Sequence, residues 1–441
     1  MSTTPDQTAA PLRFGRLVGT SIGTKLLNDT SVQIFNPYLP VIAAGLGVDV
    51  VALGRLVGLR SLMGLAAPVG GAIGERRSFR TVVCWSLLVG ALGLGLVGAA
   101  GGDGVGYGVL VLGMILSGLG IAGFVPSLQA YASSHLPYTR RARGMGMIEY
   151  SWALTGIVTL FLAGRLIEAT TWRLPFVLLA GLMVVAAVVF ARLPKEDRPG
   201  AGVADGAVAA AEAMGEPIAG LAVTEVVDAA GRQAVALAAQ PPARKDTGPL
   251  RFLWLGPGSR SAYAEIVAGG LLYFAAMQVL LVHGLWLADQ YGLNAAGLGT
   301  VALVFGLFDL LASVSVSLFV DRVGKRRSVL GGMVAGVVAY LLLPVVDSGL
   351  ATAVAGLTLA RCIFEFTIVS HFPLLSEQLP AQRGRVLTLA TSAGLLFSTA
   401  AGFVGPWLYQ RSGIAAVAMV SAATMAIAGA LVAALVREPA G

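Results

Sequence analysis

Long hydrophobic runs alternate with short charged loops along nearly the whole of this 441-residue chain. An apolar run of about 18 or more residues is long enough to cross a lipid bilayer as a helix. The pattern predicts an all-α, polytopic membrane protein with twelve transmembrane helices in two groups of six. Their approximate bounds are 18–46, 50–74, 79–100, 105–134, 143–167, 172–193, 262–288, 296–320, 327–346, 350–376, 385–409 and 414–436.

One long polar segment, 194–261, separates the two groups of helices. It is rich in Ala, Gly and Pro, which is typical of a flexible linker. A small regulatory domain is the alternative, but few large apolar residues are present to form its core. The predicted organisation is a tail, a six-helix bundle, the linker, a second bundle and a short tail, at 1–17, 18–193, 194–261, 262–436 and 437–441.

Composition supports a membrane protein, because only 12% of the residues are charged. A soluble protein carries about 25%. The net charge of +7 would otherwise suggest a nucleic-acid-binding protein, but the bases lie in short loops between helices. The chain has no phosphate-binding loop, metal-ligand cluster or nucleophile elbow. We therefore predict that it is not an enzyme, needs no metal or cofactor and binds no nucleic acid.

The loop charges alternate along the chain and predict its topology. Loops on one side of the membrane carry most of the bases, whereas the other side carries acids. Because basic loops stay in the cytoplasm, both termini and the linker are expected to be cytoplasmic, in the inner (plasma) membrane of a cell. The basic positions are Arg76, Arg77, Arg80, Arg140, Arg141, Arg143, Lys195, Arg198, Arg322, Lys325, Arg326, Arg327, Arg383 and Arg385, and the acidic ones are Asp49, Asp103, Asp289 and Asp347.

The segment Asp321–Arg327 reads DRVGKRR and joins two apolar runs. Its bases favour the cytoplasmic side, and Gly324 permits a tight turn. The segment closely resembles the D-R-x-G-R-R/K-R loop of the major facilitator superfamily. PYLPVIAAGLGV at Pro37–Val48 resembles the end of the first helix in its twelve-helix drug:proton antiporter branch, and TTWRLPFVLLAG at Thr170–Gly181 resembles the start of its sixth helix. A topogenic loop of some other polytopic protein is the alternative.

The resemblance implies two pseudo-symmetric six-helix bundles that flank a central cavity and rock about a site at the membrane midplane. Weak internal similarity agrees with this, because a shift of 247 positions lays FVP at Phe124–Pro126 on HFP at His371–Pro373. The resemblance also implies a conformational latch that meets the start of helix 5 in the outward-open state. Its residues would be Asp321, Arg322, Gly324, Lys325, Arg326 and Arg143.

The chain departs from the family pattern at several positions. The loop of the first half reads GGAIGERRSFR, with Gly74 where the acid is expected. Helix 4 has Met114 where many members carry a buried arginine, whereas Arg361 occupies the corresponding position on helix 10. Helix 5 lacks the proline that antiporters carry, which weakens the assignment to that branch.

Ionisable side chains inside membrane helices are costly unless they are paired or wet, so they are functional candidates. The predicted proton-coupling residues are Asp29, Glu149, Asp309 and Glu365. Asp29 in a dry environment can take up and release a proton, but it is equally well explained as a structural acid paired with Lys25 or Arg60. Asp309 has the alternative of a pair with a donor or base across the bundles.

Polar residues on the same helices are candidates for the wall of a substrate cavity. They are Gln33, Asn36, Arg60, Gln129, Tyr273, Gln278 and Arg361. Arg361 and Glu365 are four residues apart and share a helix face, so they are a gating pair, a site for a charged substrate or a self-neutralised pair. His283 and His371 are more readily explained by packing than by proton transfer.

These features predict a secondary active transporter that works by alternating access. The favoured function is proton-coupled efflux of a small amphipathic drug-like or metabolic compound. Proton-coupled uptake of a sugar, organic anion or siderophore-type solute is an alternative, in which Arg60 and Arg361 favour an anion. A non-transporting receptor or assembly protein is a third possibility. The expected partners are a small-molecule substrate, H⁺ and the lipid bilayer, and the expected state is a monomer.

Overall fold

The computed structural model describes residues 14–101, 104–136, 138–195, 254–346, 348–379 and 382–437. Within these ranges the side chains of residues 75, 138–139, 141–143, 313–323, 376 and 383–384 are not described. All regular elements in the described ranges are helices, as predicted. The predicted linker and the first thirteen residues fall mostly or wholly outside them. The helices before and after the linker form one compact unit.

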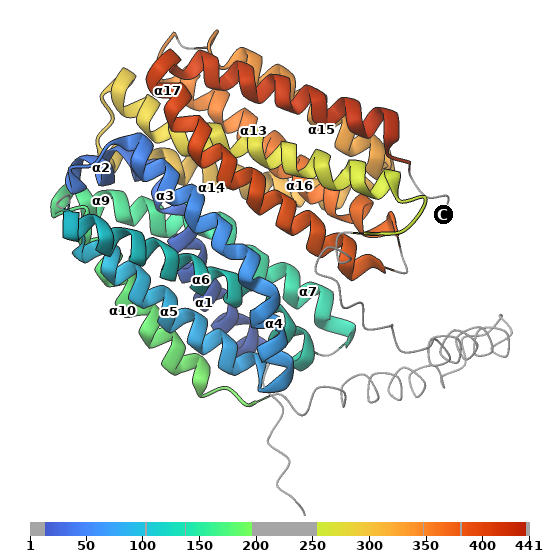
Figure 1. The fold of residues 1–441 in the computed structure, drawn as a ribbon, viewed down its shortest axis with the longest axis horizontal. Helices are drawn as coiled ribbons and strands as arrows, with labels where there is room; N and C mark the ends of the chain where they lie inside the picture. Colours follow the sequence, from blue (N-terminus) through green and yellow to red (C-terminus); the bar gives the residue numbers. More distant parts are fainter. Residues whose placement is uncertain are drawn as a thin grey trace, which may run out of the picture. The chain divides into compact units, whose positions relative to one another are not determined.

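The first bundle contains six membrane crossings, several of which are divided into shorter helices (Figure 1). A turn that is not α-helical, at Thr155–Leu160, interrupts the fifth crossing as a π-helix. The elements are α1 (Phe14–Gln33) and α2 (Phe35–Leu46), α3 (Val50–Leu62), η1 (Met63–Ala66) and α4 (Ala67–Arg76), α5 (Phe79–Ala99), α6 (Gly104–His135), α7 (Tyr138–Glu149), α8 (Ser151–Leu154), η2 (Thr155–Leu160) and α9 (Phe161–Ala169), and α10 (Arg173–Ala191).

The second bundle is built from longer uninterrupted helices. Its last element contains two crossings, because the backbone leaves helical geometry at Gly413, where φ is 70° and ψ is −173°. A positive φ favours glycine, since a Cβ would be strained there. The elements are α13 (Arg260–Tyr291), α14 (Ala295–Val323), α15 (Lys325–Leu342), α16 (Leu350–Glu377) and α17 (Arg383–Leu435).

The helices account for the twelve predicted crossings. Nine helices in the described residues are long and apolar enough to span a membrane, and one of these, at Arg385–Leu435, holds the two crossings separated by Gly413. The remaining two crossings are less apolar than these helices, for identifiable reasons. The α1–α2 crossing carries the polar stripe around Asp29, and α15 begins with three bases.

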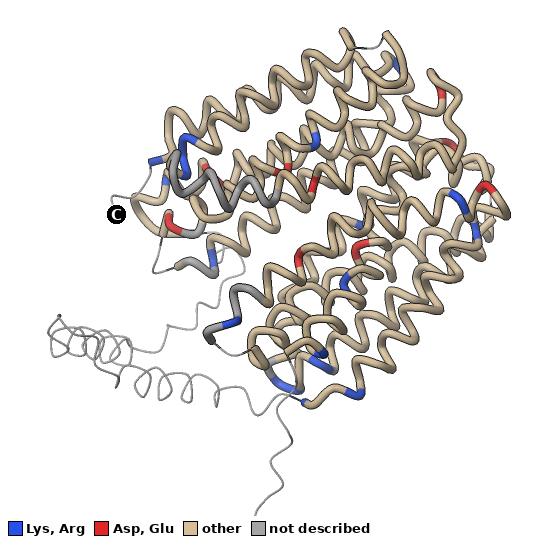
Figure 2. Tube along the Cα trace, turned by 180° about the vertical axis from the view of Figure 1, so that it is seen from behind, with Lys and Arg blue, Asp and Glu red and all other residues tan. Residues whose placement is uncertain are grey.

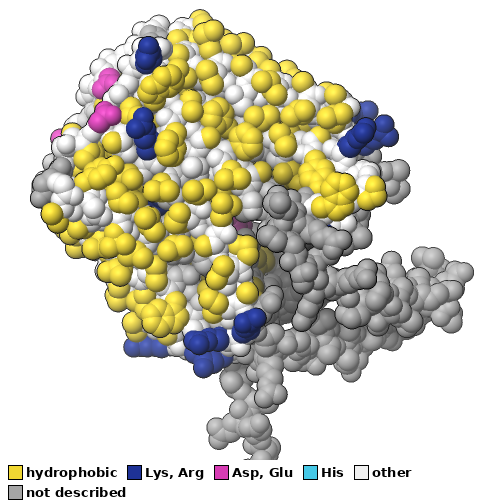
Figure 3. All heavy atoms as spheres, viewed as in Figure 1, with side chains coloured by type: hydrophobic (Ala, Val, Ile, Leu, Met, Phe, Trp, Pro, Cys, Tyr) yellow, Lys and Arg dark blue, Asp and Glu magenta, His cyan; other side chains and the backbone are white. Residues whose placement is uncertain are grey.

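The outer surface of the helices is suited to lipid. Figure 3 shows hydrophobic side chains spread across the side of the bundles, with basic side chains at the margins. Large apolar residues such as Leu92, Val185 and Val334 are more than half exposed. A soluble monomer rarely exposes a contiguous apolar surface of this extent, whereas a bilayer covers it at no cost.

The two bundles are closed against each other at one end. There α2 packs on α13, α3 on the first part of α17, and α9 on α14 (Figure 1). At this closed end Gln410 Nε2 donates to Asp49 Oδ1 across the bundles at 2.7 Å. At the opposite end, among the residues that the structure describes, neither α4 nor α7 packs closely on a helix of the second bundle. The structure is therefore open toward the end where α4 finishes at Arg76 and where Lys195 follows α10. Figure 2 shows where charged residues lie along the trace.

Small residues permit the close approach at the closed end. A Cβ added at Gly402 would lie 2.7 Å from the Cα of Gly58, and one at Gly306 would lie 2.6 Å from the carbonyl oxygen of Ala153. Such contacts are too short for any side chain, so these positions keep the bundles in direct backbone contact. Gly-rich surfaces are a common means of packing membrane helices.

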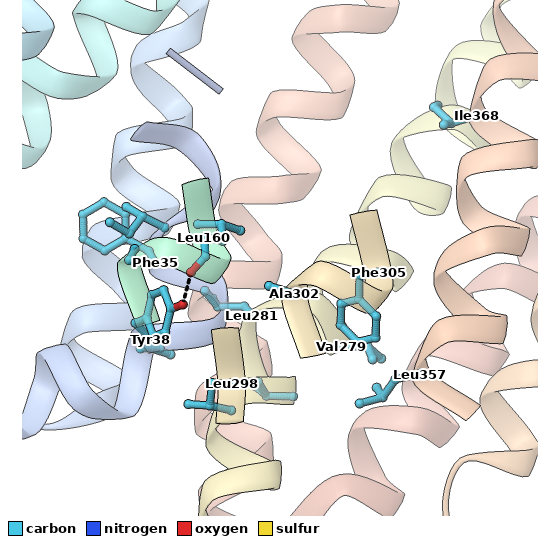
Figure 4. Close-up of a cluster of buried hydrophobic side chains, with 14 of the residues drawn as sticks. Phe35, Tyr38, Leu160, Val279, Leu281, Leu298, Ala302, Phe305, Leu357 and Ile368 are labelled. Carbon is cyan, nitrogen blue, oxygen red and sulfur yellow. Dashed lines mark hydrogen bonds between the residues drawn. The ribbon is translucent and has the colours of Figure 1, made fainter. Parts of the chain in front are cut away.

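A continuous apolar core crosses the boundary between the bundles. Figure 4 shows Tyr38 and Leu160 of the first bundle near Leu298 and Ala302 of α14. The Tyr38 hydroxyl donates to the carbonyl oxygen of Leu160 at 2.5 Å, so its polar end is satisfied within this core. Leu160 is the last residue of the π turn.

The glycine contact at the closed end predicts a shift in conformation. In a variant with Cys84 and Cys362 changed to serine, spin labels at Ala44 and Ser412 report the distance across that end. We expect Gly402→Val to add a population with a longer distance, because its side chain collides with the backbone of α3. Pulsed electron paramagnetic resonance measures the distribution.

The matched control is Gly95→Val on α5, where nothing lies within 4 Å of an added Cβ. It is expected to leave the distance distribution unchanged. An unchanged distribution in Gly402→Val would show that this contact does not keep the closed end together.

Candidate functional site

A central pocket lies between the bundles, just inside the closed end. Two adjoining hollows form it, and they share Leu280, His283, Phe305 and Arg361. The wall is mostly apolar and aromatic, with a few polar groups aimed inward. The remaining lining residues used below are Trp152, Tyr340, Phe364 and Glu365 in one hollow and Gln33 and Asn36 in the other.

The strongest charged contact in the pocket joins α16 to α14. Arg361 Nε lies 2.9 Å from both carboxylate oxygens of Asp309, and its Nη2 donates to Oδ2 at 2.7 Å. The guanidinium also lies over the Phe305 ring, 5.5 Å from its centroid. The partner of Asp309 is thus a base on a neighbouring helix of its own bundle. Arg361 is neutralised by Asp309, so it is not an isolated cation.

Arg361 also connects the two bundles at the pocket. Its Nη2 donates to Gln33 Oε1 on α1 at 3.4 Å, and Gln33 Nε2 donates to the carbonyl oxygen of Trp152 at 3.2 Å. The side chain of Gln33 is buried. The Gln33 side chain therefore connects Arg361 of the second bundle to Trp152 in the fifth crossing of the first.

A second charged group lies within the first bundle, and we call it the Lys25 network. Lys25 Nζ lies 2.9 Å from Asp29 Oδ2, 3.1 Å from Ser151 Oγ and 3.1 Å from Glu149 Oε2. Ser151 donates to the same oxygen of Asp29 at 2.6 Å. Asp29 is buried, whereas about half of the Glu149 side chain is exposed. Gln129 Nε2 extends the network by donating to Glu149 at 3.3 Å.

Arg60 lies inside the first bundle and outside the central pocket. Its Nε donates to Ser117 Oγ at 2.9 Å, and its Nη2 donates to the carbonyl oxygen of Ser31 at 2.5 Å. The ring of Phe35 lies 5.0 Å from its guanidinium carbon. Carbonyl and hydroxyl oxygens thus satisfy this buried cation, and it connects the second crossing to the first and fourth.

The other predicted cavity residues take different positions. Asn36 lines the pocket, as does Glu365. Tyr273 packs edge-on against Phe364, with ring centroids 5.9 Å apart. Gln278 is buried, and its backbone faces Gly405 of α17; neither amide atom has a hydrogen-bond partner in the described part of the chain. Neither Tyr273 nor Gln278 lines the central pocket.

The predicted latch is described only in part. Gly324 precedes α15 with a φ of 95°, a conformation that glycine adopts readily. Lys325 Nζ lies 2.5 Å from Glu377 Oε1, and Arg326 donates at 2.8 Å to the carbonyl oxygens of Val436 and Ala433. These contacts stay within the second bundle. The side chains of Asp321, Arg322 and Arg143 lie outside the described residues.

Two features of the site were not predicted from the sequence. The aromatic wall of the pocket was not identified, because Trp152, Phe305 and Phe364 resemble any apolar helix residue. The buried pair of Glu265 and His371 was also missed. Glu265 lies near the start of α13, where an acid is expected to reach water. The signal that could have found it is the helical spacing of apolar residues around it.

Comparison with known proteins identifies the family. The sequence profile of the Major Facilitator Superfamily matches residues 23–282 and 266–441, which together include both bundles. The chain belongs to the major facilitator superfamily. It is therefore a multi-pass membrane transporter and not an enzyme. Membership in the superfamily does not by itself distinguish the drug:proton antiporter branch from the others.

Full-length relatives agree with this assignment. The uncharacterized MFS-type transporter YceJ of Bacillus subtilis (strain 168) is 22% identical over 391 residues, which cover 87% of this chain and 86% of the relative. YwfA of the same strain, also an uncharacterized MFS-type transporter, is 24% identical over 396 residues, covering 88% and 84%.

Solved structures of the superfamily share the fold. A D-xylose-proton symporter superposes with a TM-score of 0.73 at 13% identity, covering 96% of this chain and 98% of the symporter. The inward open conformation of the xylose transporter XylE from E. coli gives 0.72 at 14% identity, covering 97% and 98%. At this identity the likeness concerns the fold, and it confirms the predicted pair of six-helix bundles.

The Lys25 network predicts a stability effect that depends on charge. Removing a partner from a buried ion pair costs about 3–5 kcal/mol, because it leaves a buried charge unpaired. We expect Lys25→Met to destabilise the transporter by this amount and Lys25→Met/Asp29→Asn to recover most of the loss. Thermal unfolding of the purified protein, followed by tryptophan fluorescence, measures the difference.

The matched control is Lys325→Met, which removes a pair that is about one-third exposed. Pairs that contact solvent contribute about 1 kcal/mol or less, so this variant is expected to unfold near the wild-type temperature. Equal losses in Lys25→Met and the double variant would show that Asp29 does not need Lys25.

Proposed function

We propose that the chain is a proton-coupled efflux transporter of a small amphipathic compound, working by alternating access. We further propose that it acts as a monomer in the inner (plasma) membrane, with both termini cytoplasmic. The observation that carries this proposal is the central pocket, which lies between two bundles that are closed at one end. A site in this position faces one side of the membrane and then the other as the bundles rock.

The lining of the pocket supports an amphipathic substrate. Trp152, Phe305, Tyr340 and Phe364 offer aromatic surface, which stabilises flat apolar groups and cations. A sugar site needs several hydrogen-bonding groups around each hydroxyl, whereas the polar side chains here are few. The apolar wall therefore favours a drug-like or metabolic compound with a large apolar part.

The charges of the pocket favour a cation over an anion. Arg361 and Asp309 neutralise each other, and Glu365 adds a second carboxylate to the lining. A carboxylate on the pocket wall can interact with a cationic substrate or bind a proton, and these two alternatives are the states that an antiporter exchanges.

The Lys25 network supports proton coupling by the same reasoning. One lysine contacts two carboxylates, Asp29 and Glu149, so the group carries one excess negative charge when both are ionised. In a dry environment such a charge is costly, and a proton removes the cost. Glu149 is half exposed at the open end and is the group through which water can reach the network. The proposed coupling residues are accordingly Asp29, Glu149, Asp309 and Glu365.

A test of coupling uses the purified protein in liposomes with a pH-sensitive dye inside. Wild-type and Asp29→Asn proteins are challenged with cationic dyes, organic anions and sugars. We expect an aromatic cation to raise the internal pH in wild type as it enters, because protons leave in exchange. The pH change is expected to be absent in Asp29→Asn. Movement of the compound without any proton flux in wild type would overturn the coupling proposal.

Uptake of an organic anion with protons is the second candidate, and Arg361 on the pocket wall favours it. The same assay separates the two, because symport lowers the internal pH whereas antiport raises it. A finding that no compound moves would instead point to a receptor or assembly role.

The charge of the pocket predicts substrate selectivity. We expect Glu365→Gln to weaken binding of an aromatic monovalent cation about tenfold, which corresponds to about 1.4 kcal/mol. A neutral compound of the same shape is expected to bind the two proteins equally. Quenching of tryptophan fluorescence by each compound measures the affinities. Equal loss for both compounds would show that Glu365 acts through packing and not through charge.

A further inference from the structure

A buried acid and a buried imidazole meet in the second bundle, away from the central pocket. His371 Nδ1 on α16 lies 2.8 Å from Glu265 Oε1 on α13, and both side chains are at most 3% exposed. By geometry, neither carboxylate oxygen of Glu265 nor Nδ1 of His371 forms a hydrogen bond with the described residues. A buried polar atom without a partner requires an explanation.

This pair differs in chemistry from the other two buried pairs. Asp29 is paired with a lysine and Asp309 with an arginine. Lysine and arginine keep their protons across the physiological pH range, so a proton that enters either of those pairs binds to the carboxylate. Imidazole is the side chain that ordinarily exchanges its proton between about pH 5 and 8. Of the three pairs, Glu265 and His371 are the one whose base can change its charge under physiological conditions.

The surroundings contribute little competing charge. Four helices pack on α13 and α16: α2, α14, α15 and α17. The α2 sequence has no charged residue, and neither does α17 between Val386 and Gln410. The charged and titratable side chains on these six helices include Arg260, Tyr263, Tyr273, His283, Asp289 and Tyr291 of α13, Arg361, Cys362, Glu365 and Glu377 of α16, Asp309 of α14, Lys325, Arg326, Arg327 and Tyr340 of α15, Arg385, Tyr409 and Arg411 of α17 and Tyr38 of α2.

Several of those groups are already engaged elsewhere. Arg361 is paired with Asp309, and Lys325 with Glu377. The Tyr38 hydroxyl donates to Leu160. On the near side of His371, a Cβ added at Gly269 would meet the imidazole ring, so the helix backbone closes over it. The pair is therefore buried, with the backbone of α13 at Gly269 against the imidazole ring.

We infer that Glu265 and His371 together bind one exchangeable proton, in a site of the second bundle separate from the proposed coupling carboxylates. With one proton, the pair is neutral overall, whether the proton lies on the imidazole or on the carboxyl group. Without it, the pair carries an uncompensated negative charge in a dry environment, which is costly.

The inference does not require that transport be proton-coupled. If transport is coupled as proposed above, the site supplies a second proton-binding position, in the opposite bundle from the Lys25 network. Because proton binding is measured on the protein itself, a failure of the transport proposal leaves the test of this site intact.

The test follows the pH dependence of thermal unfolding in detergent. Above about pH 6.5 an unfolded chain carries neutral histidine and ionised glutamate. The proposed folded pair binds one proton more than this unfolded chain, so the proposal predicts that stability decreases as the pH rises above 6.5. We expect this extra proton of the folded pair to lower the unfolding temperature of wild type by about 2 °C for each pH unit of increase. This component is expected to disappear in Glu265→Gln, which keeps the shape but cannot share the proton.

The matched control is His135→Gln on α6, which removes a histidine outside the pair and is expected to keep the wild-type slope. The comparison uses the change in unfolding temperature per pH unit and not the unfolding temperature itself. A variant that is less stable overall can therefore still be compared with wild type. A second measurement uses ¹⁵N-labelled histidine in nanodiscs, where the chain contributes three histidines. The His371 resonance is assigned by its loss in His371→Gln.

We expect the His371 resonance at pH 7.5 to move in Glu265→Gln, because the proton bound between the two groups is lost. A slope that is equal in wild type and Glu265→Gln would overturn the proposal. A His371 resonance that is identical in the two proteins would show that the histidine is not part of the proton site.

Discussion

The cost of burying charge among membrane helices controls much of this structure. In the part of the chain that the structure describes, the charged side chains buried between the helices, apart from Glu265 beside His371, are each met by an opposite charge, a hydroxyl or a carbonyl oxygen. The Arg361–Asp309 pair is the clearest example, with three contacts of 2.7 to 2.9 Å. These pairs fix the orientation of their helices, because neither member can turn toward lipid without leaving the other unpaired.

The two bundles compensate their buried charges in different ways. In the first bundle one lysine serves two carboxylates, one buried and one half exposed. In the second bundle the arginine is held by Asp309 and faces the pocket with Glu365 nearby. Gln33 joins the two halves through a neutral amide, and this joint can break without exposing a charge. A transporter that rocks between two states needs firm contacts inside each bundle and weaker ones between them.

The fold could be predicted from the sequence because lipid imposes a simple rule. Twelve apolar runs, the polar segment at 194–261 and the loop at Asp321–Arg327 were sufficient, since backbone groups in lipid must be satisfied within each helix. Pairing was harder to predict. Asp29 with Lys25 follows from a spacing of four residues, but Asp309 with Arg361 and Glu265 with His371 join different helices. Which faces meet depends on helix rotation, and a single sequence does not specify that rotation.

One departure from the family pattern, the missing proline of the fifth crossing, is accompanied by an irregular turn in the same helix. The fifth crossing lacks a kinking proline, and a π turn at Thr155–Leu160 interrupts it instead. A π turn disturbs the helical hydrogen bonds, and two side chains of the first crossing contact it: Tyr38 donates to Leu160, and Thr30 lies 2.7 Å from Thr159. About one turn before Leu160, Gly156 fits against Gly306 of α14. The turn therefore lies where the fifth crossing touches both the polar stripe and the other bundle. A helix that is already irregular there can bend at little further cost, so this position is suited to movement between the bundles.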